Sequence, residues 1–310
     1  MQTRSLLMKC SQPAFFQMQG AMTCVPQRNF GVNEKALKIR MKSVGSIGKI
    51  TKAMKMVSAS KMKGDLKRLA DGKNFGCDAV DMIFKSDQFM QRKMAAEPAD
   101  PVTVLVPITS DKGLCGAVNS SIVREIKGLV QGVNRSKYSI FSIGEKGSTG
   151  MVRPFPDMLK YSITHIGTPY NYPTVMALAV NISQMANDAD KITVIFNEFK
   201  SAISYVIRHM ELMPKQRFLE SMQFAKLYNQ TLPDKNTSNP ALYELYLTSN
   251  LWVALLNNAA SEQSARMNAM ENASKNAKEI LDGLTLEYNK ARQARITMEL
   301  VEIISGASAL

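Results

Sequence analysis

Apolar residues recur every three or four positions in the first part of the chain, from Asn33 to about Met94, where there is no proline. This spacing predicts a long amphipathic helix. The average step is slightly below 3.6, which is typical of a helix that winds left-handed around a partner helix. The predicted seam consists of Leu37, Met41, Val44, Ile47, Ile50, Met54 and Val57.

A second long helix is predicted at the carboxyl end. Asn239 is placed to cap it, Pro240 to occupy its first position, and no proline follows. At 1.5 Å per residue it extends about 100 Å, too long for one compact domain, so its seam needs a partner helix. The first helix is the obvious partner, antiparallel if the intervening insert has its ends close together. The seam comprises Leu242, Tyr246, Val253, Leu256, Ala260, Met267, Met270, Ala277, Leu281, Leu284, Tyr288, Ala291 and Met298.

Between the helices the pattern changes to short β-rich runs that alternate with helical stretches. The runs are VTVLVPI, KYSIFSIG, LKYSITHI, KITVIFNEF and SAISYVIRHM, with helices expected near 117–130 and 174–186. Alternation of this kind predicts a mostly parallel sheet, and the last two runs predict a hairpin at its edge. The expected fold is an α/β insert domain plus two long helices forming an antiparallel coiled coil.

Composition suggests that the first 30 residues are a leader. They contain Arg4, Lys9 and Arg28, and no acidic residue occurs before Glu34, which is typical of a mitochondrial transit peptide. A merely disordered amino terminus is the alternative. The predicted organisation is a leader at 1–30, a coiled-coil helix at 31–95, an α/β domain at 100–232 and a second coiled-coil helix at 238–310.

Charge narrows the possible partners. The chain has 39 Lys and Arg against 26 Asp and Glu, a net charge of +13. Residues 33–73 hold 12 Lys and Arg against three acids, Glu34, Asp65 and Asp71, so this helix has an excess of nine positive charges. An acidic partner is therefore expected. No aromatic residue lies between Phe30 and Phe75, which disfavours single-stranded nucleic acid, whereas binding to the backbone of duplex DNA stays open.

Candidate chemistry is sparse. The segment GSIGKIT (45–51) lacks the spacing of a phosphate-binding loop. The segment TSDKGLCG (109–116) follows a predicted strand and precedes a helix, so it forms either an anion-holding turn or, as we favour, a structural turn. His165 and His209 lie in predicted strands without metal-site spacing, and Cys115 is expected to be a buried thiol. These features argue against a self-contained enzyme.

Three longer motifs carry a resemblance to a known family. They are KITKAMKMVSASKM (49–62), TSDKGLCGAVNSS (109–121), and SEQSARMNAMENASKNAKEI with YNKARQARITMELVEIISGASAL (261–280 and 288–310). In this order they closely resemble the gamma subunit of F-type ATP synthase, in its mitochondrial form. The resemblance implies two long helices in an antiparallel coiled coil around an α/β domain.

The resemblance also implies a function. The chain would be a rotating shaft without active site, bound nucleotide or metal of its own, because Mg and ATP or ADP would be held by alpha and beta subunits of a surrounding ring. Further expected partners are delta/epsilon-type stalk subunits and the membrane c-ring, and nucleic acid is not among them. The expected location is the matrix side of the mitochondrial inner membrane, as a peripheral subunit.

By position in the family motifs, contact roles fall on three groups. Lys52, Met54 and Lys55 would face an acidic beta-subunit loop; Arg292, Gln293 and Thr297 would form catch contacts with the ring; Ile303, Ile304, Ala307 and Leu310 would lie in an apolar bearing. Arg295 departs from the family pattern, in which that position is small or apolar, and could add a charge contact or alter the catch. The foot at 201–228 also matches less well. A basic coiled-coil DNA-binding protein and an α/β nucleotide enzyme remain as alternatives.

Overall fold

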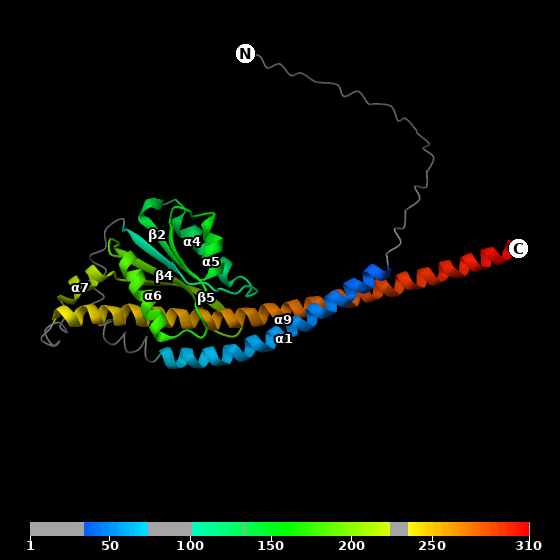
Figure 1. Ribbon diagram of the computed structural model, residues 1–310, viewed down its shortest axis with the longest axis horizontal. Coiled ribbons are helices and arrows are strands. Elements are labelled where there is room, and N and C mark those ends of the chain that lie inside the picture. The colour runs from blue at the N-terminus through cyan, green and yellow to red at the C-terminus, as the bar shows by residue number, and fades with distance from the viewer. Residues whose placement is uncertain (1–33, 74–100, 133, 224–234, 310) are drawn as a thin grey trace, which may run out of the picture. The chain divides into compact units, whose positions relative to one another are not determined.

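The computed structural model describes residues 34–73, 101–132, 134–223 and 235–309 (Figure 1). The predicted leader, the first helix beyond Lys73, most of the linker before Pro101, and Leu310 lie outside these residues. The chain divides into two compact units. The larger is Ile39–Leu286, and the smaller joins the chain up to Lys38 with Glu287–Leu310.

The described elements follow the predicted order of helix, α/β layer and helix. They are α1 (Glu34–Lys73), β1 (Thr103–Pro107), α4 (Val118–Val130), the 3₁₀ helix η2 (Arg135–Lys137), β2 (Tyr138–Ile143), α5 (Glu145–Val152), β3 (Leu159–Ile163), α6 (Tyr172–Met185), β4 (Lys191–Phe199), β5 (Tyr205–Leu212), α7 (Lys215–Gln223) and α9 (Lys235–Ser308). All five predicted strands and both predicted short helices are confirmed. The helices α5 and α7 were not predicted.

The sheet has the strand order β3-β2-β1-β4-β5. All neighbours are parallel except β4 and β5, which form the predicted antiparallel hairpin. Strand β1 lies at the centre and is buried throughout, as expected for a parallel strand covered on both faces.

Helices cover both faces of this sheet (Figure 1). One core joins Val104 and Val106 of β1 to side chains of α6 and α9, whereas the other joins Leu105 to α4 and α5. This division follows from the strand period of two, which sends alternate side chains to opposite faces. The amino-terminal half of α9 is thus a layer of the α/β domain as well as part of the helix pair.

Within the larger unit α1 and α9 run antiparallel (Figure 1). A Cβ placed on Gly48 would lie 3.7 Å from the Cβ of Ala277, and Lys55 pairs with Glu271 further along α1. Near the end of α1, Gly72 approaches Leu256. Residues with higher numbers in α1 thus contact residues with lower numbers in α9. This order confirms the predicted antiparallel pair.

The predicted seam of α1 needs a correction after Val44. Ile47, Ile50 and Val57 are exposed, and their neighbours are covered instead. The covered positions alternate steps of four and three: Met41, Val44, Gly48, Thr51, Lys55, Ser58, Met62, Asp65, Leu69 and Gly72, with Met54 also half-buried. Small residues occupy much of this seam because they let the two backbones approach closely. In α9 the predicted positions from Met270 to Leu284 are buried or half-buried.

The predicted start of the second helix is also wrong. Helix α9 begins at Lys235, so that Pro240 lies inside it and Asn239 is not its cap. Pro240 is the sixth residue of α9, so the N–H that would bond to the carbonyl oxygen four residues earlier is missing and the helix loses one hydrogen bond there.

Candidate coupling surface

An apolar and basic surface follows α1 beside the seam. Ile47 and Ile50 are 51% and 58% exposed. Lys49, which lies between them in the chain, and Lys52, which follows them, are exposed as well. Contiguous apolar side chains on a surface mark interaction sites. The isoleucines that the periodicity assigned to the seam therefore belong to this outward face.

The three residues expected to face an acidic loop are not equivalent. Lys52 is exposed, whereas Met54 and Lys55 are half-buried. The ammonium group of Lys55 pairs with Glu271 of α9 at 3.1 Å, and Lys55 lowers the pKa of Glu271 through a hydrogen bond and its charge. Of the three side chains, Lys52 is the one that points its charge outward without a described ion pair.

In the smaller unit, the carboxyl-terminal part of α9 presents the expected catch residues. Arg292, Gln293 and Thr297 are all exposed. The hydroxyl of Thr297 donates to the carbonyl oxygen of Gln293 at 3.0 Å, one turn earlier. Arg292 and Gln293 therefore keep their polar ends at the surface, whereas the Thr297 hydroxyl is engaged within the helix.

The expected apolar bearing is exposed too. Ile303 and Ile304 are 67% and 65% exposed, and Ala307 is also exposed; Leu310 is outside the described residues. Sequence reasoning missed the apolar neighbours on the same segment, Ile296, Met298, Leu300 and Val301. The signal was their distribution around the helix, because a helix that is apolar on several sides is normally buried.

A buried ion pair fixes the 109–116 loop to α9. Glu262 and Arg266 are one turn apart, and both are 6% exposed. The guanidinium group of Arg266 also donates to the carbonyl oxygens of Lys112 and Gly113, at 3.4 Å each. Burial raises the pKa of Glu262, and Arg266 opposes that shift. The loop therefore presents carbonyl oxygens to a resident guanidinium, which supports the structural turn.

The same stretch of α9 holds the β4–β5 hairpin. Ser264 and Asn268 both donate to the carbonyl oxygen of Ala202, at 2.7 and 2.8 Å. Inside the domain, the amide nitrogen of Asn197 donates to the side-chain oxygen of Asn258 at 3.1 Å. One face of α9 thus joins two loops and the sheet.

The remaining candidate groups do not form a reactive site. Cys115 is buried, and burial raises the pKa of its thiol, as expected for a structural cysteine. His209 lies in β5, 3.1 Å from Glu125. His165, predicted in a strand, instead follows the end of β3 with a φ of 58°. Among the described residues, no group of three or more His, Cys, Asp or Glu side chains is arranged to hold a metal.

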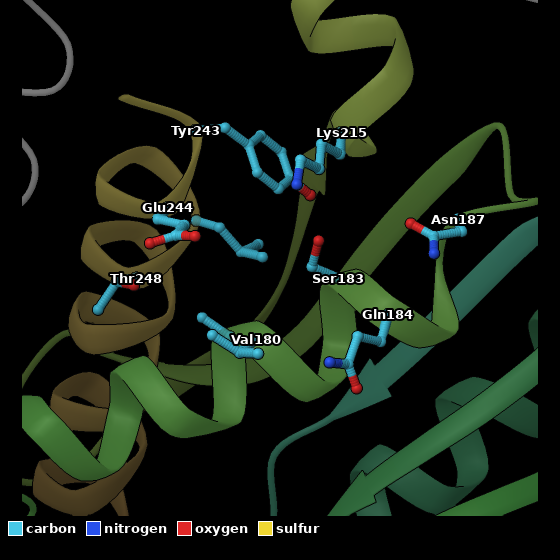
Figure 2. Close-up of a pocket in the computed structure, with 10 residues that line it drawn as sticks. Val180, Ser183, Gln184, Asn187, Lys215, Tyr243, Glu244 and Thr248 are labelled. Carbon is cyan, nitrogen blue, oxygen red and sulfur yellow. The ribbon is translucent and has the colours of Figure 1, made fainter. Parts of the chain in front are cut away.

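A pocket of about 170 Å³ lies between α6, the start of α7 and α9. Figure 2 shows Ser183 and Gln184 of α6 opposite Tyr243 and Glu244 of α9. Burial raises the pKa of Tyr243 to about 12. None of the predicted contact residues lines this pocket.

In the described part of the chain, no helix is long and apolar enough to cross a membrane.

Comparison with known proteins gives consistent results. A family model described as ATP synthase matches residues 33–310. The mitochondrial ATP synthase F(1) complex subunit gamma of Dictyostelium discoideum is 35% identical over 289 residues, which cover 92% of this chain and 94% of that protein. The mitochondrial ATP synthase subunit gamma of Ipomoea batatas is 38% identical over 291 residues, covering 90% and 86%. A solved chain from the central stalk and c-ring of the Tetrahymena thermophila mitochondrial ATP synthase matches with a TM-score of 0.66 and 49% identity, covering 73% of this chain and 99% of that one.

Proposed function

We propose that this chain, which belongs to the gamma-subunit family of ATP synthases, is the central rotating shaft of a mitochondrial ATP synthase. It couples proton-driven rotation of the c-ring to conformational change at catalytic sites in the alpha/beta ring. The observation that carries this proposal is the end of α9, where every described residue from Arg292 onward is exposed although many are large and apolar. Such a segment needs a surrounding partner.

The shaft acts without chemistry of its own. Active sites, Mg and ATP or ADP belong to the alpha and beta subunits, and the chain binds none of them directly. The 109–116 loop supports this assignment, because Arg266 already engages the carbonyl oxygens of Lys112 and Gly113. An anion-binding loop would instead direct backbone N–H groups at its ligand.

Coupling then follows from shape. An asymmetric rod presents different side chains to equivalent sites, so its rotation changes which site is open, through different contacts with two conformations. Moving a site from 1:99 to 99:1 requires about 5.5 kcal/mol of such difference. An exposed ion pair contributes about 0–1 kcal/mol. The coupling free energy is therefore spread over packing and several charges.

The contact roles divide between the two helices. Lys52 faces an acidic beta-subunit loop, while Met54 and Lys55 act next to it, with the Lys55 charge shared with Glu271. Arg292, Gln293 and Thr297 form catch contacts with the ring. Ile303, Ile304, Ala307 and Leu310 turn in an apolar bearing, together with the exposed neighbours of that segment.

Partners and location follow from the same family. The Tetrahymena structure contains a central stalk and a c-ring, which supports a foot on the c-ring and contact with further stalk subunits. The mitochondrial relatives support placement on the matrix side of the inner membrane.

Isolation of the tagged chain from mitochondria in mild detergent tests the proposal. We expect a complex of several hundred kilodaltons with two nucleotide-binding ring subunits and ATPase activity. A small species without ring subunits would contradict it. Steeply salt-dependent binding to duplex DNA by that species would favour the DNA-binding alternative.

A further inference from the structure

Glu34 opens α1 and is held by side chains of α9. Its carboxylate lies close enough to the phenol of Tyr288 to raise the pKa of that phenol. It also pairs with Arg295 at 2.6 Å. A carboxylate in the first turn of a helix is favoured by the helix dipole as well. Three interactions therefore converge on the first residue of α1.

Arg295 bridges two carboxylates. One terminal nitrogen pairs with Glu34, and Nε pairs with Glu299 on its own helix at 3.3 Å. Tyr288 and Arg295 are seven residues apart, so both lie on the same face of α9, two turns from each other. Tyr288 and Arg295 therefore reach Glu34 from turns that are two apart, and Glu299 pairs with the arginine from one turn further on.

The cluster lies at the last part of α9 that is shielded from solvent. Leu37, one turn into α1, is buried, as is expected of a seam residue. On α9, Tyr288 and Ala291 are half-buried, and every described residue after Ala291 is exposed. Glu34 is accordingly the better covered member of its ion pair, with 20% side-chain exposure against 58% for Arg295.

We propose that Glu34, Tyr288 and Arg295 form a clasp that terminates the helix pair, holding the amino end of α1 on α9 in one register. Arg295 is thus a positioning residue that acts within the chain. Without the clasp, the first turn of α1 frays, because the first four N–H groups of a helix have no intrahelical partner. The proposal concerns contacts inside the chain, so it stands or falls separately from the shaft function.

Hydrogen exchange in the purified native complex tests the clasp. We expect Arg295→Gln and Glu34→Gln each to increase exchange at the amides of residues 38–42 by about fivefold, because each removes the same ion pair. The double variant should exchange no faster than either single variant. Exchanging the charges, Glu34→Arg with Arg295→Glu, should restore part of the protection.

Two further variants test whether faster exchange is specific to loss of the clasp. Lys290→Gln removes an exposed cation of the same segment that has no described ion pair, and it should leave exchange at 38–42 unchanged. Tyr288→Phe removes only the hydroxyl and should accelerate exchange by a smaller factor. Unchanged exchange in Arg295→Gln and Tyr288→Phe, or equal acceleration in Lys290→Gln, would overturn the clasp.

Discussion

Gly72 of α1 and Leu256 of α9 are in such close contact that a Cβ on the glycine would lie 2.5 Å from Cδ1 of the leucine. The same Cβ would lie 3.0 Å from Nε1 of Trp252. Leu256 is buried, so neither side chain can move away freely. This glycine sets how closely the two helices approach near the α/β domain.

A methyl group at this position should therefore destabilise the protein. Overpacking a core destabilises the folded state by about 1–3 kcal/mol. Replacing glycine by alanine in a helix otherwise stabilises it by about 1 kcal/mol. Gly64→Ala is the matched control, because nothing lies within 4 Å of its Cβ position. We expect the free energy of unfolding of Gly72→Ala to lie below that of Gly64→Ala by about 1–3 kcal/mol. Equal unfolding midpoints would show that the contact relaxes without cost.

The buried pair of Glu262 and Arg266 gives a pH-dependent prediction. Arg266→Met leaves a buried carboxylate without its cation, which should cost about 3–5 kcal/mol at neutral pH. Burial already raises the folded-state pKa of Glu262, and losing Arg266 raises it further. The folded state then binds more protons than the unfolded state between the two pKa values, so stability falls as pH rises through that window.

Thermal unfolding at pH 5 and pH 8 checks this sign. The penalty of Arg266→Met should be smaller at pH 5, and the double variant Glu262→Gln/Arg266→Met should lose most of the pH dependence. A penalty that grows on acidification would be inconsistent with a buried, uncompensated Glu262.

The amide pair of Asn197 and Asn258 should show strong coupling. Asn258→Leu removes the oxygen that accepts from Asn197, so the buried Asn197 amide keeps only its longer hydrogen bond to the carbonyl oxygen of Val118, at a cost of about 1–3 kcal/mol. Replacing both residues by leucine removes the unpaired group as well. A double-mutant cycle on unfolding free energies should therefore give a double variant less destabilised than the sum of the single variants. Additive losses would mean that the two amides act independently.

The contacts proposed for Arg292 and Gln293 predict a functional defect. Both are exposed, so changing them together to alanine should leave folding and assembly nearly intact while lowering ATP turnover of the complex. Reversal of Lys52 alone should be mild, because the coupling free energy is spread over several contacts. Normal turnover in the assembled double variant would remove the catch assignment.

The sequence predicted the strands and the helix pair, because burial of repeated apolar positions decides both. It failed where small polar residues replace apolar ones. Gly48, Thr51 and Ser58 are covered and Ile47 and Ile50 are exposed, since close helix approach favours small residues and a partner surface favours large apolar ones. Apolar periodicity alone cannot separate these two reasons for an isoleucine.

Contacts between segments far apart in the chain were the other feature that the sequence did not predict. Nothing in the local sequence pairs Arg266 with the carbonyl oxygens of the 109–116 loop, or Arg295 with Glu34, because both contacts join segments far apart in the chain. The resemblance identified Arg295 as unusual, and the fold supplied its partner. Pro240 shows the reverse case, in which a strong local signal for a helix start lies five residues inside α9.

Direct observation of rotation tests the central claim. A cysteine introduced at the exposed Ser120 of α4 would carry a bead or fluorophore, with Cys10, Cys24 and Cys77 replaced by serine and the buried Cys115 left unreactive. With the beta subunits of the purified complex fixed to a surface, the account predicts ATP-dependent rotation of the probe in one direction, at a rate that follows ATP hydrolysis. A probe that stays fixed while the same complexes hydrolyse ATP would contradict it.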